Sequence, residues 1–192
     1  MSLQELINDP FALLLELENR AKSANERGRS VNEEAAEWIG VSFRLASERF
    51  VTARADVREV LPVPDQVTRI PGAKPWLRGI ANIRGQLLTI VDLKAFLGAG
   101  PAHTDRKARL LLLASREVPS AIIVDEVLGF RRFANSDFSE SVPVTEVRCD
   151  HYLTGTYRRE GEAYPLFDLS RLIDDPSFLS AGVLKADARG VA

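Results

Sequence analysis

The chain has 192 residues, one cysteine and a formal net charge of −2 at pH 7. This length predicts one domain with a core large enough to fold without disulfide bonds. The nearly balanced charge supplies no positive field for phosphate groups, which argues against nucleic acid as a partner. Because Cys149 has no second cysteine to pair with, an intramolecular disulfide and a cysteine-pair metal site are both excluded. A reducing cytoplasm is the expected setting.

An N-terminal helical extension is expected over residues 1–40. An Asp-Pro pair at 9–10 signals a helix start, and an amphipathic pattern follows from 11 to 27. The apolar run at 11–15 is far shorter than the about 18 residues that a membrane-spanning helix needs. No direct membrane insertion is therefore expected.

Short strands are predicted after the extension. From Val41 to Pro64 the apolar residues recur with a period of about two, as in strands with one buried face. Three later runs are continuously apolar: Leu110 to Leu113, Ala121 to Val124 and Val127 to Phe130. Such runs predict strands that are buried on both faces or closed into a barrel.

Two stretches of the chain, 76–97 and 152–173, repeat one plan. Both read aromatic-Leu-x-Gly-x5-Gly-x6-Asp-Leu and align without a gap. The second glycine, Gly85 in the first copy, permits the positive φ of a tight turn and predicts a β-hairpin. Asp92 and Asp168 each end a strand ahead of a helical pattern, so their carboxylates are expected to cap the helix that follows.

The repeat predicts two similar small modules, because a solenoid needs at least about three units. Related segments also precede the two copies, Val57-Arg-Glu-Val-Leu61 and Val124-Asp-Glu-Val-Leu128. Each half is expected to follow the order β-β-β-β-β-α, which gives a mainly β fold of two small five-stranded barrels with short capped helices. The boundary between the halves is expected near 98–107, a polar and flexible segment. A groove between the modules is the expected binding site.

No active site is visible in the sequence. His103 and His151 have neither metal-ligand spacing nor a triad partner, and no nucleotide or cofactor motif is present. Asp92 and Asp168 could divide acid and base roles, but a position that recurs with the repeat favours capping. We expect no catalytic residue, no metal and no cofactor.

Arg84 is the candidate for recognition. It lies at the predicted hairpin tip beside Gly85. There its guanidinium can offer five hydrogen-bond donors to a partner while contributing little to the stability of the fold. The small residues Gly79 and Ala81 would let another backbone approach closely. The alternative is that Arg84 is simply solvated.

Several motifs carry a resemblance to a known family. They are Pro75-Trp-Leu-Arg-Gly-Ile-Ala-Asn-Ile-Arg-Gly-Gln-Leu-Leu-Thr-Ile-Val-Asp-Leu93, Ile122-Ile-Val-Asp-Glu-Val-Leu-Gly-Phe130, Tyr152-Leu-Thr-Gly155 and Leu166-Phe-Asp-Leu169. Through them the chain resembles the CheW-like adaptors of bacterial chemosensory arrays. The resemblance implies a CheW-like domain of two intertwined five-stranded SH3-like β-barrels at 41–175, followed by a C-terminal tail at 176–192.

The resemblance implies an adaptor without enzymatic activity. Such an adaptor holds the cytoplasmic tip of a methyl-accepting chemoreceptor between its barrels and docks the regulatory domain of a CheA-like histidine kinase. It works in the cytoplasm at membrane-associated receptor arrays. The positions that match the family's receptor contacts are Val57, Glu59, Gly79, Arg84 and Phe130, the last replacing a smaller apolar residue. The resemblance identifies no kinase-docking residues.

Within the family, the N-terminal extension and the acidic stretch Phe138-Ser-Glu140 are most similar to the PilI type, which serves the system that controls twitching by type IV pili. An adaptor of a flagellar or other chemosensory array is the alternative. A small-barrel enzyme or a nucleic-acid-binding module is a remote one.

Overall fold

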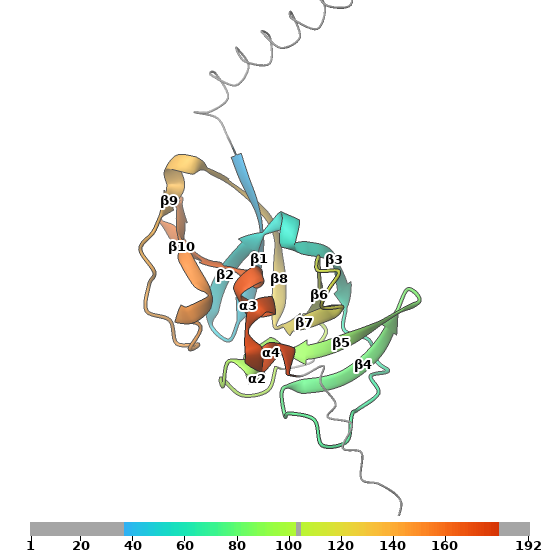
Figure 1. Cartoon of the computed structure of the whole chain (residues 1–192). Helices are drawn as coiled ribbons and strands as arrows, with labels where there is room; N and C mark the ends of the chain where they lie inside the picture. The colour runs from blue at the N-terminus through green and yellow to red at the C-terminus, as the bar shows by residue number, and fades with distance from the viewer. Residues whose placement is uncertain (1–36, 103–104, 181–192) are drawn as a thin grey trace, which may run out of the picture. The chain divides into compact units, whose positions relative to one another are not determined.

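The computed structural model describes residues 37–102 and 105–180, and Figure 1 shows this part as two β-sheets with a few short helices. The helix expected at 11–27 lies outside the described residues. In the described part of the chain, no helix is both long and apolar enough to cross a membrane.

The strands of sheet A are β1 (Glu37–Leu45), β2 (Glu48–Ala53), β8 (Glu126–Ala134), β9 (Phe138–Ser139), β10 (Leu153–Arg159) and β11 (Glu162–Phe167). Those of sheet B are β3 (Val57–Pro62), β4 (Leu77–Ile83), β5 (Gln86–Asp92), β6 (Arg109–Leu113) and β7 (Ser120–Val124). Over the described residues, sheet A has the order β8-β1-β2-β11-β10-β9 and sheet B the order β3-β6-β7-β5-β4. The helices are α2 (Leu93–Phe96), α3 (Leu169–Asp174) and α4 (Pro176–Leu179), with single 3-10 turns at η1 (Arg54–Asp56), η2 (Asn135–Asp137) and η3 (Asp150–Tyr152).

Each sheet takes strands from both halves of the sequence. Sheet A joins β1 and β2 to β8 through β11, whereas sheet B joins β3 through β5 to β6 and β7. Two parallel pairings, β2 with β11 and β5 with β7, connect strands from different halves. The expected mainly β fold of two intertwined units is therefore confirmed. Sheet A also includes β9, a sixth strand of two residues that nothing in the sequence marks.

The expected boundaries need three corrections. The segment at 98–107 does not divide the two sheets, since β5 before it and β6 after it both belong to sheet B. The chain instead crosses between sheets at η1 and again at Asp125, between β7 and β8. The first strand begins at Glu37, inside the expected extension. Residues 176–179 of the expected tail form α4, where Phe178 is buried.

Burial on both faces of sheet B explains two of the three continuous apolar runs, 110–113 in β6 and 121–124 in β7. The third run, 127–130, lies in β8 of sheet A and is only partly buried, with Phe130 exposed, so the expectation of full burial is wrong there. In β6, Leu111 and Leu113 belong to the main core, whereas Leu110 and Leu112 belong to a second cluster, as the alternation of side chains in a strand requires. Neighbouring β7 divides its apolar residues in the same way. The main core also holds Phe43, Phe50 and Phe167 of sheet A, so it lies between the two sheets.

The two copies of the repeated plan form matching hairpins. Arg84 and Gly85 join β4 to β5 with φ values of 53° and 82°, and Glu160 and Gly161 join β10 to β11 with φ values of 55° and 78°. In both hairpins the strands pair directly across a two-residue loop. Positive φ at both loop residues is the feature of type I′ turns, which match the twist of the strands.

Candidate partner-binding groove

A groove of about 370 Å³ opens where the two sheets meet. One wall is β3 of sheet B, over residues 57–60, and the other is formed by β1 and β8 of sheet A, with η1 between them. Val57 at its floor is buried, and Val41, Val60 and Val127 add further apolar lining. The sequence therefore places an apolar trough at the junction of the two sheets, as expected for a site between two modules.

Phe130 is the aromatic side chain in the lining of the groove. Its side chain is 63% exposed, which is unusual for so large an apolar group. The guanidinium carbon of Arg54 lies 5.5 Å from the centre of the Phe130 ring, within cation–π range. The same guanidinium donates a hydrogen bond to the carbonyl oxygen of Val57 at 2.8 Å. Arg54 thus links the exposed ring on β8 to the start of β3.

Glu59, which lines the groove, forms an ion pair that the sequence did not predict with Arg84, which is not itself among the lining residues. Arg84 Nη2 lies 2.6 Å from Glu59 Oε1, with the two side chains 72% and 28% exposed. Arg84 belongs to the β4–β5 turn, whereas Glu59 belongs to β3 at the opposite edge of sheet B. The contact therefore shows that sheet B curls until its hairpin tip reaches its other edge strand. Arg84 thus makes one structural contact, an exposed ion pair.

Gly79 has a packing role that explains its residue type. Its φ is +136°, and an added Cβ would lie 2.1 Å from the backbone oxygen of Thr68. Thr68 and Ile80 exchange two backbone hydrogen bonds, at 2.8 and 2.9 Å, which fix this approach. The backbone that approaches Gly79 thus belongs to the chain itself. Gly79 is not among the residues that line the groove.

Several groove residues were missed by the sequence analysis. Arg54 had no motif to mark it, and Val60 and Val127 were read only as strand residues. A usable signal was present, because the related segments Val57–Leu61 and Val124–Leu128 supply most of the β3 wall and the beginning of the β8 wall. Because related segments of two modules can face each other across their junction, this similarity would have pointed to Val60 and Val127, but not to Arg54.

The two aspartates at the ends of the repeated hairpins accept hydrogen bonds from helix N-termini. Asp168 Oδ1 accepts from the backbone N–H groups of Ser170 and Arg171, at 2.9 and 3.3 Å, at the start of α3. Asp92 Oδ1 accepts from the N–H of Ala95 at 3.0 Å, at the start of α2. These contacts satisfy donors that a helix leaves unpaired in its first turn.

Asp92 differs from Asp168 in what else it holds. The Asp92 side chain is 1% exposed, and its Oδ2 accepts a hydrogen bond from the N–H of Ala102 at 2.9 Å. Arg78 Nη1 lies 3.9 Å from the same oxygen. Asp92 therefore caps α2 and also anchors the segment after it through the N–H of Ala102.

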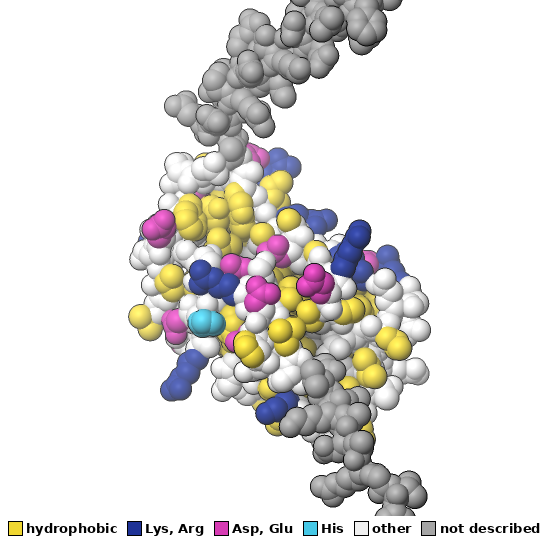
Figure 2. Space-filling view, in the orientation of Figure 1, with side chains coloured by type: hydrophobic (Ala, Val, Ile, Leu, Met, Phe, Trp, Pro, Cys, Tyr) yellow, Lys and Arg dark blue, Asp and Glu magenta, His cyan; other side chains and the backbone are white. Residues whose placement is uncertain are grey.

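The arrangement of charged and metal-binding groups can be described for residues 37–102 and 105–180. Among the residues at 37–102 and 105–180, no three His, Cys, Asp or Glu side chains are placed to hold a metal ion. On the face drawn in Figure 2, acidic side chains gather near the centre, and Lys and Arg side chains lie both beside them and toward the margin. Burial, offset in part by a hydrogen bond with Thr145, raises the pKa of the Cys149 thiol to about 11. This thiol is thus protonated near neutral pH.

Comparisons with known proteins agree on one family. The model of the CheW-like domain matches residues 40–177. The chain is 33% identical to Protein PilI of Pseudomonas aeruginosa, over 92% of this chain and 98% of that protein. It is 28% identical to Protein FrzA of Myxococcus xanthus, over 68% of this chain and 82% of that protein. The crystal structure of the scaffolding protein TtCheW from Thermoanaerobacter tengcongensis matches with a TM-score of 0.63 at 25% identity, over 73% of this chain and 95% of that one.

Proposed function

The chain belongs to the CheW-like domain family, and on this premise we propose that it is a non-enzymatic adaptor of a chemosensory array. It couples the cytoplasmic tip of a methyl-accepting chemoreceptor to the regulatory domain of a CheA-like histidine kinase. It is a cytoplasmic protein that is recruited to receptor arrays at the membrane. The observation that carries this proposal is the apolar groove between the sheets, with the exposed Phe130 on one wall and the Glu59–Arg84 pair at its rim.

The groove suits an amphipathic helical partner. Its apolar floor at Val57 can take the hydrophobic residues that a helix presents at every third or fourth position. Arg84 remains 72% exposed although it pairs with Glu59, so most of its donors are available to polar groups at the edge of such a helix. Val57, Glu59, Arg84 and Phe130 are therefore the proposed receptor contacts. Gly79 would affect receptor binding only indirectly, by allowing the close packing of Thr68 against β4.

The system served is the one that controls twitching by type IV pili. This assignment is supported by the similarity to PilI, which covers 92% of the chain and thus extends beyond the family domain at 40–177. The chain shares only 24% identity with the chemotaxis protein CheW of Bacillus subtilis, over 59% of its length. A likeness that includes the N-terminal extension favours the pilus system over a flagellar one.

The test is a binding measurement with both partners in parallel. The full-length chain would be titrated against a purified receptor signalling fragment and a purified kinase regulatory domain from its own organism, and then against both together. An adaptor binds each partner separately and forms a ternary complex with both. Binding to the kinase domain alone, with no receptor affinity at any attainable concentration, would rule out the adaptor role. Loss of twitching on gene deletion, with swimming unchanged, would support the pilus system.

A further inference from the structure

Asp125 lies at the second of the two crossings between the sheets. It is the single residue between β7 of sheet B, which ends at Val124, and β8 of sheet A, which begins at Glu126. The residue is only 5% exposed. A buried carboxylate is costly unless it is paired, so its contacts need an explanation.

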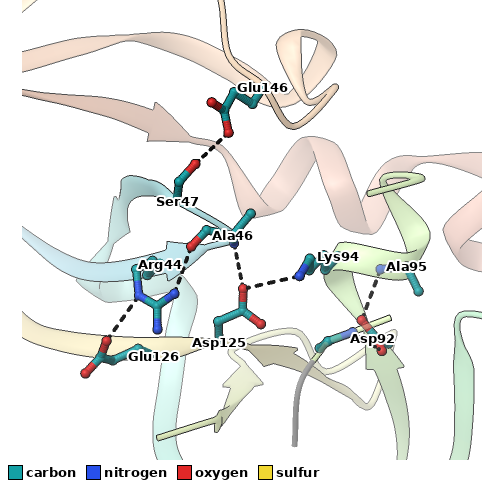
Figure 3. A network of polar contacts seen from close by, with 10 residues as sticks. Arg44, Ala46, Ser47, Asp92, Lys94, Ala95, Asp125, Glu126 and Glu146 are labelled. Carbon is teal, nitrogen blue, oxygen red and sulfur yellow. Dashed lines mark hydrogen bonds and ion pairs between the residues drawn. The ribbon is translucent and has the colours of Figure 1, made fainter. Parts of the chain in front are cut away.

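The contacts of Asp125 join parts of both sheets, as Figure 3 shows. On the side of sheet A, its Oδ2 accepts a hydrogen bond from the N–H of Ala46 at 2.6 Å, in the turn between β1 and β2. Its own N–H donates to the carbonyl oxygen of Arg44 at 3.1 Å. On the side of sheet B, Lys94 Nζ of α2 lies 4.0 Å from the same Oδ2, and the Lys94 side chain is 12% exposed.

The next residue strengthens the same connection. Arg44 Nε lies 3.1 Å from Glu126 Oε2, and Arg44 Nη1 donates to the carbonyl oxygen of Ala46 at 2.8 Å. Ala46 has a φ of 53°, a conformation that residues with a side chain rarely adopt. Both backbone polar groups of this strained residue are thus held by side chains, one from the crossing and one from β1.

Stability alone gives a poor account of this arrangement. A buried ion pair seldom adds net stability over an apolar pair of the same size, because desolvation offsets the attraction. Asp125 Oδ1 is buried and has no hydrogen-bond partner among the described residues, which adds to the cost. The contacts of the buried Asp125 carboxylate are better explained by a role in fixing how β8, the β1–β2 turn and α2 are arranged.

We infer that Asp125 is a positioning residue for the groove. It holds the first residues of β8 against both the β1–β2 turn and α2, and three residues of that strand, Val127, Gly129 and Phe130, line the groove opposite β3. The carboxylate thereby fixes the position of the β8 wall relative to the β1–β2 turn and α2 without touching a ligand. The role of Asp125 in groove geometry follows from the contacts in the structure, whereas its effect on receptor binding rests on the proposed function.

The test begins with Asp125→Asn, which keeps the shape of the side chain and removes its charge. In methyl NMR spectra of the full-length chain, the groove residues Val57, Val60 and Val127 should shift, while Leu88 in the second core cluster should not. Affinity for the receptor fragment should fall about tenfold or more, and affinity for the kinase domain should stay within about twofold. The matched control is Asp168→Asn, which removes the same charge at a helix cap and should leave the groove methyl signals and both affinities unchanged.

A second variant separates positioning from stability. Asp125→Asn with Lys94→Met removes both charges, so it should recover the urea midpoint that the single variant loses. If Asp125 positions the groove, the double variant keeps the shifted methyl signals and the weak receptor binding. Recovery of receptor affinity together with stability would overturn the inference, as would unchanged groove methyl signals in the single variant. If Asp125→Asn does not fold, the double variant carries the same comparison with the wild type.

Failure of the two proposals can be told apart. A wild-type chain that does not bind the receptor fragment contradicts the adaptor role, whereas the methyl signals still report on the groove. A wild-type chain that binds the fragment, with Asp125→Asn binding equally well, contradicts only the positioning role.

Discussion

The guanidinium of Arg84 lies 2.6 Å from the carboxylate of Glu59, which joins the tip of the β4–β5 hairpin to the strand at the other edge of the same sheet. Because the Arg84 side chain is 72% exposed, solvent screens the pair, and its contribution to stability is about 0–1 kcal/mol. The pair therefore orients the guanidinium at the groove rim more than it stabilises the fold.

Arg84→Glu should fold normally and lose receptor binding. The charge reversal removes a screened ion pair and places two carboxylates near each other at the surface, so unfolding free energy should fall by no more than about 1 kcal/mol. Reversing a charge that becomes desolvated in an interface costs about 2–5 kcal/mol of binding free energy. Parallel titrations with receptor fragment and kinase domain measure this. Glu160→Lys, at the tip of the second hairpin, is the matched control and should change neither affinity; equal losses for both partners with Arg84→Glu would contradict the groove assignment.

Gly79→Ala should destabilise the chain by more than about 2 kcal/mol, because the added Cβ meets a backbone oxygen that is held by two hydrogen bonds and φ is positive. Gly72→Ala is the control, since its φ is also positive but no atom lies within 4 Å of the added carbon. Its cost should be about 1–2 kcal/mol, from the backbone conformation alone. Urea unfolding of both variants decides whether close packing adds to the conformational cost at Gly79.

Glu160→Asn should stabilise the chain by roughly 0.5–1 kcal/mol, because asparagine adopts positive φ more readily than glutamate and Asn-Gly is the preferred loop of a two-residue hairpin. The side chain of Glu160 is highly exposed, so little packing is lost. A rise in the urea midpoint with an unchanged m-value is the expected result. A fall would mean that the Glu160 side chain makes a contact that stabilises the turn.

Asp92→Ala should cost more than Asp168→Ala. Both lose a helix cap, which is worth about 0.5–2 kcal/mol. Both also remove a carboxylate that lies near an arginine, Arg78 or Arg171, but only the first leaves the N–H of Ala102 unpaired in a buried site. Comparison of the two unfolding free energies checks this, and equal values would mean that water replaces the carboxylate at Ala102. Binding per folded molecule should be unchanged in both variants.

The pH dependence of stability should include a contribution from Asp175. Burial by itself would raise the pKa of Asp175, but hydrogen bonds from Tyr152 and from the N–H groups of Ser177 and Phe178 outweigh it, so the pKa is lowered. A lowered folded-state pKa gives stability that is fully present above the unfolded value of about 3.9 and is lost as pH falls through the folded value. Asp175→Asn should therefore destabilise at neutral pH, and its deficit should shrink below about pH 4. A deficit that is constant over this range would contradict the assignment.

The strands and hairpins could be predicted because each leaves a local pattern in the chain. The period of two after Val41 and the glycines of the repeat act within a few residues, and both hairpins formed where the repeat placed them. The exchange of strands between halves was implied only by the family resemblance and could not be predicted from the apolar pattern, because a continuous apolar run such as 110–113 shows that a strand is buried but not which strand lies beside it. The Arg84–Glu59 pair was missed for the same reason, since it depends on how sheet B curls.

The pairing of β2 with β11 has a consequence for how the protein forms in the cell. Val51 pairs with Leu166, so the middle of sheet A joins residues 115 positions apart (166 − 51). Such distant contacts slow folding, because the chain loses the entropy of closing a large loop before the contacts of the pairing can stabilise it. While residues 162–167 are still within the ribosome, β2 has one unpaired edge, which is prone to wrong pairing. Sheet A can therefore be completed only after most of the chain has been synthesised, and a product truncated before β11 should aggregate rather than yield a working half.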